Sequence, residues 1–162
     1  MQDSSNYRKN DSSRRVQSAN PRGGNYNRSA RSNIVEEWFG KNTFSKDWIE
    51  KEVDAAMVVY TESAGMFMAK NGLTNSKIRS IYGEIKRIQM GKYEDEKTSF
   101  LLLRPKVAYA VGRDSHNNGL ALFKRIFDEA STYVTDQKSF NNFYNLFEAI
   151  LAYHKSHGGK IR

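Results

Sequence analysis

Cysteine is absent from this chain of 162 residues, and its absence excludes several kinds of chemistry. The protein can form no disulfide, no zinc–thiolate site and no cysteine nucleophile. A chain without thiols suits a reducing compartment, and we expect it to work in the cytoplasm. Long hydrophobic runs are also missing. None approaches the roughly 20 apolar residues that span a bilayer, and we expect no signal peptide because the N-terminus has no apolar core.

Leucine, isoleucine and phenylalanine are missing from residues 1–33, which are rich in Ser, Asn, Arg and Gly. Such a segment cannot bury enough apolar surface to offset the entropy that is lost on ordering. It carries seven basic and two acidic residues, and therefore +5 of the total net charge of +8. We expect a disordered basic arm, which either contacts RNA weakly through its arginines and tyrosines or serves as a solubilising tail.

Apolar residues first gather in the segment IVEEWF, residues 34–39, which we interpret as a short helix or a docking segment. Together with the arm it forms a first unit, residues 1–42. A helical domain, residues 43–162, follows. This domain has enough residues for a core of its own.

Alternation of apolar and polar residues at a period of two, which is typical of strands, is missing over any useful length. Apolar residues instead recur at steps of three and four, which predicts an all-α fold, a compact bundle of about five or six helices. One helix is expected from Ser45 to about Lys70, with Gly65 as a point where it can bend and Gly72 as its end. The next covers residues 74–88, with Asn75 or Ser76 as its cap.

Three further helical regions follow in the sequence. Residues 97–113 are expected to form a well-buried pair of helices that meet near Leu103 and Pro105, or one kinked helix, because proline fits only the first turn of a helix. Another helix is expected over residues 120–133, with an inward face of Leu122, Phe123, Ile126, Phe127 and Ala130.

The last helix has the clearest pattern of all. Asp136 or Ser139 can cap its start, and Gly158 and Gly159 supply a left-handed residue that ends it. One face of this helix is apolar and largely aromatic: Phe140, Phe143, Phe147, Ile150, Leu151 and His154. The opposite face is narrow and polar: Asn141, Asn145, Glu148 and Lys155.

Basic residues share helix faces in two of the expected helices. Arg79 and Lys86 are seven residues apart with Gly83 between them, so a phosphate could approach the backbone there. In the following helix Lys106, Tyr109 and Arg113 are spaced by three and four, a cation–aromatic–cation line that suits phosphate contact and base stacking. The alternative is that these are solvated outer faces with Tyr109 in the core. The candidate RNA-binding residues are Lys77, Arg79, Lys86, Arg87, Lys106 and Arg113.

Catalytic and metal-binding patterns are scarce. His154 and His157 could face one metal ion, but no third ligand is evident. The sequence has no phosphate-binding glycine loop, no serine elbow and no zinc-protease helix. The acidic residues Glu94, Asp95 and Glu96 are expected in a solvated turn. We therefore expect no catalytic residue, no metal and no cofactor. Two alternatives stay open: a small metal-dependent RNA nuclease that uses Glu94, Asp95 or Glu148, and a helical DNA- or RNA-binding module of another kind.

Three stretches occur together in one order: TNSKIRSIYGEIKRI, LLLRPKVAYAVGR and FEAILAYHKSHGGK. Over about residues 45–160 the chain thereby resembles the small subunit of type III-A CRISPR effector complexes, the second Csm protein. The last stretch is the most specific of the three. Residues 1–42 lie outside the resemblance.

The resemblance implies a non-catalytic, all-helical subunit that takes part in defence against invading nucleic acid. Its implied partners are guide RNA and target RNA, the other subunits of the effector complex, and copies of itself stacked head to tail. Nuclease activity belongs to neighbouring subunits in that family. Exposed aromatic residues such as Trp38, Phe39 or Tyr144 could serve the contact between copies, although each is equally compatible with a place in the core.

Overall fold

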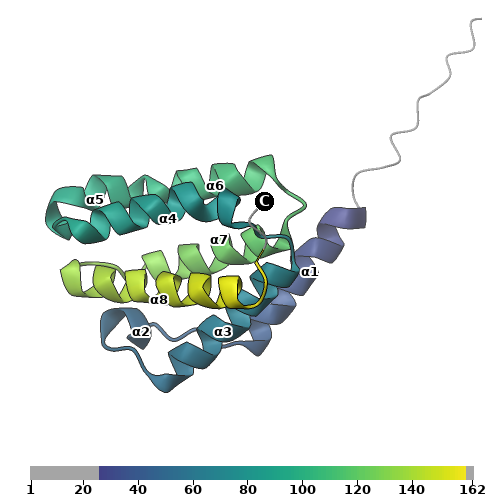
Figure 1. Cartoon of the computed structure of the whole chain (residues 1–162), viewed down its shortest axis with the longest axis horizontal. Coiled ribbons are helices and arrows are strands. Elements are labelled where there is room, and N and C mark those ends of the chain that lie inside the picture. Colours follow the sequence, from purple (N-terminus) through teal and green to yellow (C-terminus); the bar gives the residue numbers. More distant parts are fainter. Residues whose placement is uncertain (1–25, 160–162) are drawn as a thin grey trace, which may run out of the picture.

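Helices make up the regular structure of residues 26–159, the part of the chain that the computed structural model describes; its side chains are described from residue 34 onward (Figure 1). The all-α fold is confirmed, with no strand among these residues. In chain order the helices are α1 (Tyr26–Lys41), α2 (Asp47–Glu50), α3 (Ala55–Lys70), α4 (Asn75–Met90), α5 (Tyr93–Leu101), α6 (Leu103–Arg113), α7 (Asn118–Ser131) and α8 (Gln137–Ser156). No helix of the described part has the length and apolar character needed to cross a membrane.

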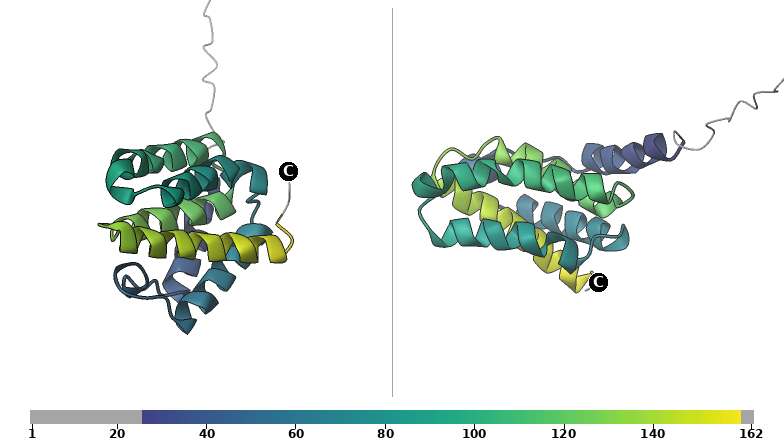
Figure 2. Two further views of the ribbon diagram at one scale, coloured as in Figure 1. Left: turned by 60° about the vertical axis from the view of Figure 1, so that its left-hand side comes forward. Right: turned by 90° about the horizontal axis from the view of Figure 1, so that it is seen from above.

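Helix α8 lies in the middle of the molecule. It packs against α2 and α3 on one side and against α4 and α5 on the other, while α7 contacts α1, α3 and α6. Figures 1 and 2 show the result as three layers, with α4, α5 and α6 in one, α7 and α8 in the next, and α1, α2 and α3 in the third. The central position of α8 agrees with its sequence, because α8 carries the most continuous aromatic face.

The core around α8 is built from phenylalanine rings. Phe143 lies at its centre, with ring centroids 4.8 Å from Phe147 on the same helix, 5.3 Å from Phe127 on α7 and 5.3 Å from Phe100 on α5. All four side chains are at least 97% buried. Tilted and edge-on contacts of this kind add to the free energy of burial. The inward face predicted for α7 is confirmed in full.

Side-chain caps set the start of several helices. Asp136 accepts a hydrogen bond from the Ser139 backbone N–H at 2.7 Å, and the Ser139 hydroxyl oxygen accepts one from the Asp136 N–H, which together form a capping box. The hydrogen bonds that the Ser139 backbone N–H and hydroxyl donate to the Asp136 carboxylate hold the pKa of Asp136 below its usual value. The cap of α4 is Thr74, not Asn75 or Ser76 as expected, because the Thr74 hydroxyl is the group that reaches the Lys77 N–H.

The single helix expected from Ser45 to Lys70 is wrong, since the chain breaks between α2 and α3. Asp54 is extended and accepts a hydrogen bond from the Met57 N–H at 2.8 Å, which starts a new helix at residue 55. Gly65 does not mark a bend. It lies where α3 contacts α8. An added Cβ would lie 2.6 Å from the backbone nitrogen of His154 and 2.7 Å from the backbone oxygen of Ile150.

The pair of helices expected around Pro105 is present. The break comes at Leu102, between α5 and α6, and Pro105 lies in the first turn of α6, where its missing N–H costs no intrahelical bond. Leu101 and Leu102 are exposed, so the expectation of a well-buried pair is wrong in part: only the side toward α4, α7 and α8 is covered. The acidic residues 94–96 lie in the first turn of α5. Carboxylates in this position interact favourably with the helix dipole and stabilise the helix.

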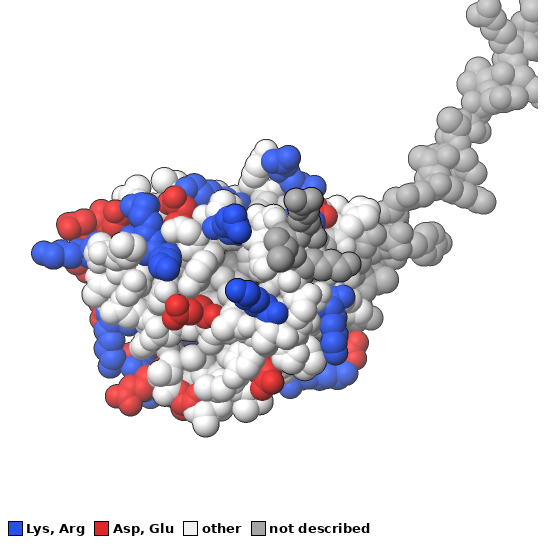
Figure 3. All heavy atoms as spheres, in the orientation of Figure 1, with Lys and Arg blue, Asp and Glu red and all other residues white. Residues whose placement is uncertain are grey.

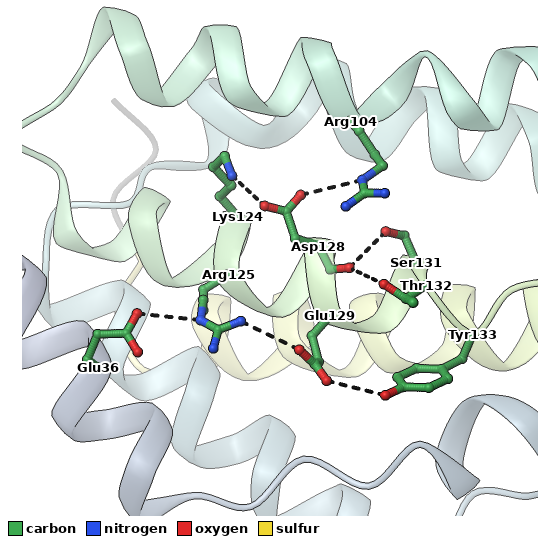
Figure 4. A network of polar contacts seen from close by, with 9 residues as sticks. All are labelled: Glu36, Arg104, Lys124, Arg125, Asp128, Glu129, Ser131, Thr132 and Tyr133. Carbon is green, nitrogen blue, oxygen red and sulfur yellow. Dashed lines mark hydrogen bonds and ion pairs between the residues drawn. The ribbon is translucent and has the colours of Figure 1, made fainter.

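The segment 34–39 belongs to α1 and contributes Val35 and Trp38 to the core. Arg125 of α7 contacts this helix: it pairs with Glu36 at 3.4 Å (Figure 4). Its guanidinium lies 4.3 Å from the Phe39 ring centroid. Of the expected disordered arm, residues 1–25 lie outside the described part, whereas the backbone of residues 26–33 is helical. The division of the chain at residue 42 stays a prediction.

Candidate nucleic-acid interface

Four of the six predicted RNA-binding residues line one hollow between α4 and α6, which we call the α4–α6 groove. Its volume is about 590 Å³. Lys77 and Arg79 come from α4, and Lys106 and Arg113 come from α6. Helical periodicity placed each pair on its own helix, but only the side-by-side packing of α4 and α6 brings the two pairs together. The other lining residues are Ser80, Ile81, Gly83, Glu84, Tyr109 and Ala110.

Arg79 and Arg113 carry the positive charge of this groove that no acid neutralises. Within the described residues, neither has a carboxylate oxygen within 4.0 Å. The Arg113 guanidinium instead lies 5.7 Å from the centroid of the Tyr109 ring. The hypothesis that Tyr109 belongs to the core is wrong, because its side chain is 67% exposed. The cation–aromatic–cation line of α6 therefore faces solvent.

The other two predicted cations of the groove, Lys77 and Lys106, have acidic neighbours. Lys77 forms a short ion pair with Asp114, and this hydrogen bond, with help from Asn117, lowers the pKa of Asp114. Lys106 lies 3.8 Å from Glu84. Exposed ion pairs of this kind contribute only about 0–1 kcal/mol, so a phosphate can compete for the cation.

Arg87 and Lys86 lie outside the lining of the groove. Arg87 donates to Glu96 at 2.8 Å, which raises the pKa of the guanidinium and lowers that of the carboxyl group. Lys86 is exposed on the same face of α4 as Arg79, seven residues further along. The structure thus separates the predicted set into four residues that converge on the groove and two that lie further along α4.

Figure 3 shows one face of the molecule, with basic side chains gathered over the side formed by α4, α5 and α6. Acidic side chains interrupt this region at one end, as the pairing of Arg87 with Glu84 and Glu96 requires. Acidic side chains therefore lie among the basic ones on this side, and Glu84, near the middle of α4, is close to both Arg87 and Lys106.

A second hollow, the α4–α8 groove, lies on the other side of α4 and has a volume of about 400 Å³. Arg79 lines both grooves, and Lys155 of α8 lines this one. The sequence had placed Lys155 on the polar face of α8 but not among the RNA-binding candidates. The sequence could not show that Lys155 lies close to α4, because three other helices separate α4 from α8 along the chain.

The candidate catalytic and metal-binding groups do not converge. Glu148 accepts a hydrogen bond from the Tyr144 hydroxyl at 2.9 Å, and Glu94 and Asp95 are exposed on α5. His154 is fully buried, and its Nε2 lies 2.8 Å from the Leu73 carbonyl oxygen. Among the described residues, no group of three His, Cys, Asp or Glu side chains is placed to hold a metal ion.

Comparison with known proteins adds one match. Residues 51–160, more than half of the chain, match the family model described as Csm2 Type III-A. No curated protein and no solved structure gives a match. The matched range contains α3 to α8 and with them both grooves.

Proposed function

The chain belongs to the Csm2 Type III-A family, the small subunit of the type III-A Csm complex, and we propose that it binds RNA there along the ribose-phosphate backbone without reading base sequence. The partners proposed are the guide RNA and the target RNA. In an RNA-guided complex base pairing supplies the sequence recognition, so a subunit of this kind needs only phosphate contacts. The family is generally a non-catalytic structural subunit, and we infer the same role for this chain.

The observation that carries the proposal is the convergence of Lys77, Arg79, Lys106 and Arg113 on one groove. Two cations come from each of two packed helices, so the groove offers contacts for more than one phosphate. The groove is open to solvent along α4, where Gly83 has no neighbouring atom within 4 Å of an added Cβ. A phosphate can therefore approach the helix backbone closely at this glycine.

The test of this proposal is the double variant Arg79→Ala with Arg113→Ala. Because both guanidinium groups lack an acidic partner within the described residues, the double variant removes two phosphate-binding groups and disturbs no ion pair. We expect affinity for a single-stranded RNA of mixed sequence to fall by roughly tenfold at physiological salt, equally for different sequences. The slope of log K against log salt should fall by about one unit for each of the two arginines replaced. Fluorescence anisotropy over a salt series measures both.

The matched control is Lys46→Ala with Lys51→Ala. These two lysines flank α2, in the layer opposite α4 and α6, and form only exposed ion pairs with Glu50 and Asp47. The control removes the same two positive charges from a different place. Equally weakened binding in both double variants would mean that net charge alone, and not the α4–α6 groove, attracts the RNA.

Stacking of copies is the second part of the proposal. The aromatic side chains expected to serve it are not available, since Trp38 and Tyr144 are 91% buried and Phe39 lies under Arg125. Exposed apolar residues lie instead at opposite layers, with Val58 and Val59 on α3 and Leu101 on α5. Such an arrangement favours a head-to-tail contact over a two-fold one. We expect Val59→Asp to weaken concentration-dependent association in sedimentation velocity by several-fold; unchanged association would exclude this surface.

A further inference from the structure

Tyr109 differs from the other aromatic residues of the described part. Every other ring from residue 34 to residue 159 is buried or half-buried, and most of them contact another ring. Tyr109 is 67% exposed, and its neighbour is Arg113, whose guanidinium lies 5.7 Å from the ring centroid. The folded core therefore does not account for this ring, and one of its faces is available to a ligand.

The surroundings of Tyr109 point to a nucleotide. Lys106 and Arg113 lie one helical turn before and after it on α6, and Arg79 and Ser80 face it from α4 across the α4–α6 groove. The groove volume of about 590 Å³ lies in the range of clefts that hold small organic ligands, ~300–1,000 Å³. An aromatic platform between cations is the arrangement by which proteins bind single strands, with the base on the ring and the phosphates on the cations.

We infer that the α4–α6 groove takes an unpaired nucleotide, with its base stacked on the free face of Tyr109 and its flanking phosphates held by Lys106, Arg113 and Arg79. A base inside a duplex is covered on both faces by its neighbours and cannot stack on a side chain. The groove therefore distinguishes single-stranded RNA from duplex, which phosphate contacts alone do not. This inference rests on the proposed function and adds to it the form of RNA that the groove accepts.

The experiment uses the full chain and two probes: a labelled RNA of about 12 nucleotides, mixed in sequence and without self-pairing, which suits the length bound by single-strand grooves, and the same strand annealed to its complement. Tyr109→Leu removes the ring but keeps an apolar side chain, and Tyr109→Phe keeps the ring. Because Tyr109 is exposed, both variants should melt at the temperature of the parent protein. We expect Tyr109→Leu to weaken binding of the single strand about tenfold and binding of the duplex less than about twofold. Tyr109→Phe should bind both probes as the parent does.

Equally weakened binding of the two probes, or unchanged binding of the single strand, would overturn the inference. So would an equal effect in Tyr109→Phe, because stacking needs the ring and not the hydroxyl. These results differ from a failure of the proposed function itself, which would appear as an unchanged salt slope in the Arg79→Ala, Arg113→Ala variant. If that slope falls while Tyr109→Leu has no selective effect, the cations bind RNA and only the stacking is wrong.

Discussion

Replacing Phe143 with alanine is expected to lower the free energy of unfolding by about 3–5 kcal/mol, because it removes a large ring from the centre of the core. The ring is fully buried at the point where α5, α7 and α8 meet, 5.3 Å from Phe100 and Phe127 and 4.8 Å from Phe147. Its removal takes apolar surface out of the core and leaves a cavity that rigid neighbouring rings fill poorly. Small domains are stable by only about 5–15 kcal/mol, so the variant should be close to unfolding at physiological temperature.

Urea unfolding followed by circular dichroism measures this destabilisation. The control is Phe143→Leu, which keeps most of the volume and should cost less than half as much. A decrease below about 1 kcal/mol for Phe143→Ala, far under the usual cost of such a truncation, would mean that the packing between the layers does not depend on this ring. The core also sets the position of α4 relative to α6, so an unfolded fraction should bind RNA without the selectivity of the groove.

The substitution Gly65→Ala is expected to lower the free energy of unfolding by about 1–2 kcal/mol, although alanine is the better helix former. The added methyl group would lie 2.6 Å from the His154 nitrogen and 2.7 Å from the Ile150 oxygen, both backbone atoms of α8. A flexible side chain could rotate away from the added methyl group, but these backbone atoms cannot. The helices α3 and α8 must therefore move apart. Overpacking of this kind costs about 1–3 kcal/mol or more, which exceeds the gain of roughly 1 kcal/mol in helix propensity.

Gly83→Ala provides the matched control, because Gly83 also lies within a helix but has open space around it. Without a clash, only the gain in helix propensity remains, and the variant should be more stable by about 1 kcal/mol. Thermal or urea unfolding of the two variants should therefore give changes of opposite sign. If Gly65→Ala also stabilised the protein, α3 and α8 would not be in close contact at residue 65 and this prediction would be wrong.

Much of the fold could be predicted from local pattern. The aromatic period of residues 140–154 predicted the buried face of α8, and Asp136 and Gly158 predicted its ends. The sequence failed where local signals compete. One continuous helix was predicted from Ser45 to about Lys70, and Trp48, Met57 and Tyr60 within it are buried, yet the cap made by Asp54 interrupts that helix. A side-chain cap and a helix interior offer the chain alternative hydrogen bonds, and packing decides between them.

The candidate site shows the same division. Spacings of three and four placed Lys106, Tyr109 and Arg113 on one face of a helix, and the structure confirms that they share it. The sequence could not tell whether Tyr109 points to solvent or to the core, because an aromatic residue at helical spacing fits both. It also could not show that Lys77 pairs with Asp114, which lies 37 residues further along the chain.

The sequence by itself determined most of the helical residues, several helix ends and the apolar sides of the helices, because these depend on hydrogen bonds and contacts within about one helical turn. Its family also followed from the sequence, through three motifs in a fixed order. Tertiary structure alone decided that α4 and α6 lie side by side, that Arg79 borders two grooves and that Tyr109 is uncovered. Those features depend on how helices far apart in the chain pack around α8, and that packing minimises the exposed apolar surface of the whole domain rather than of any one segment.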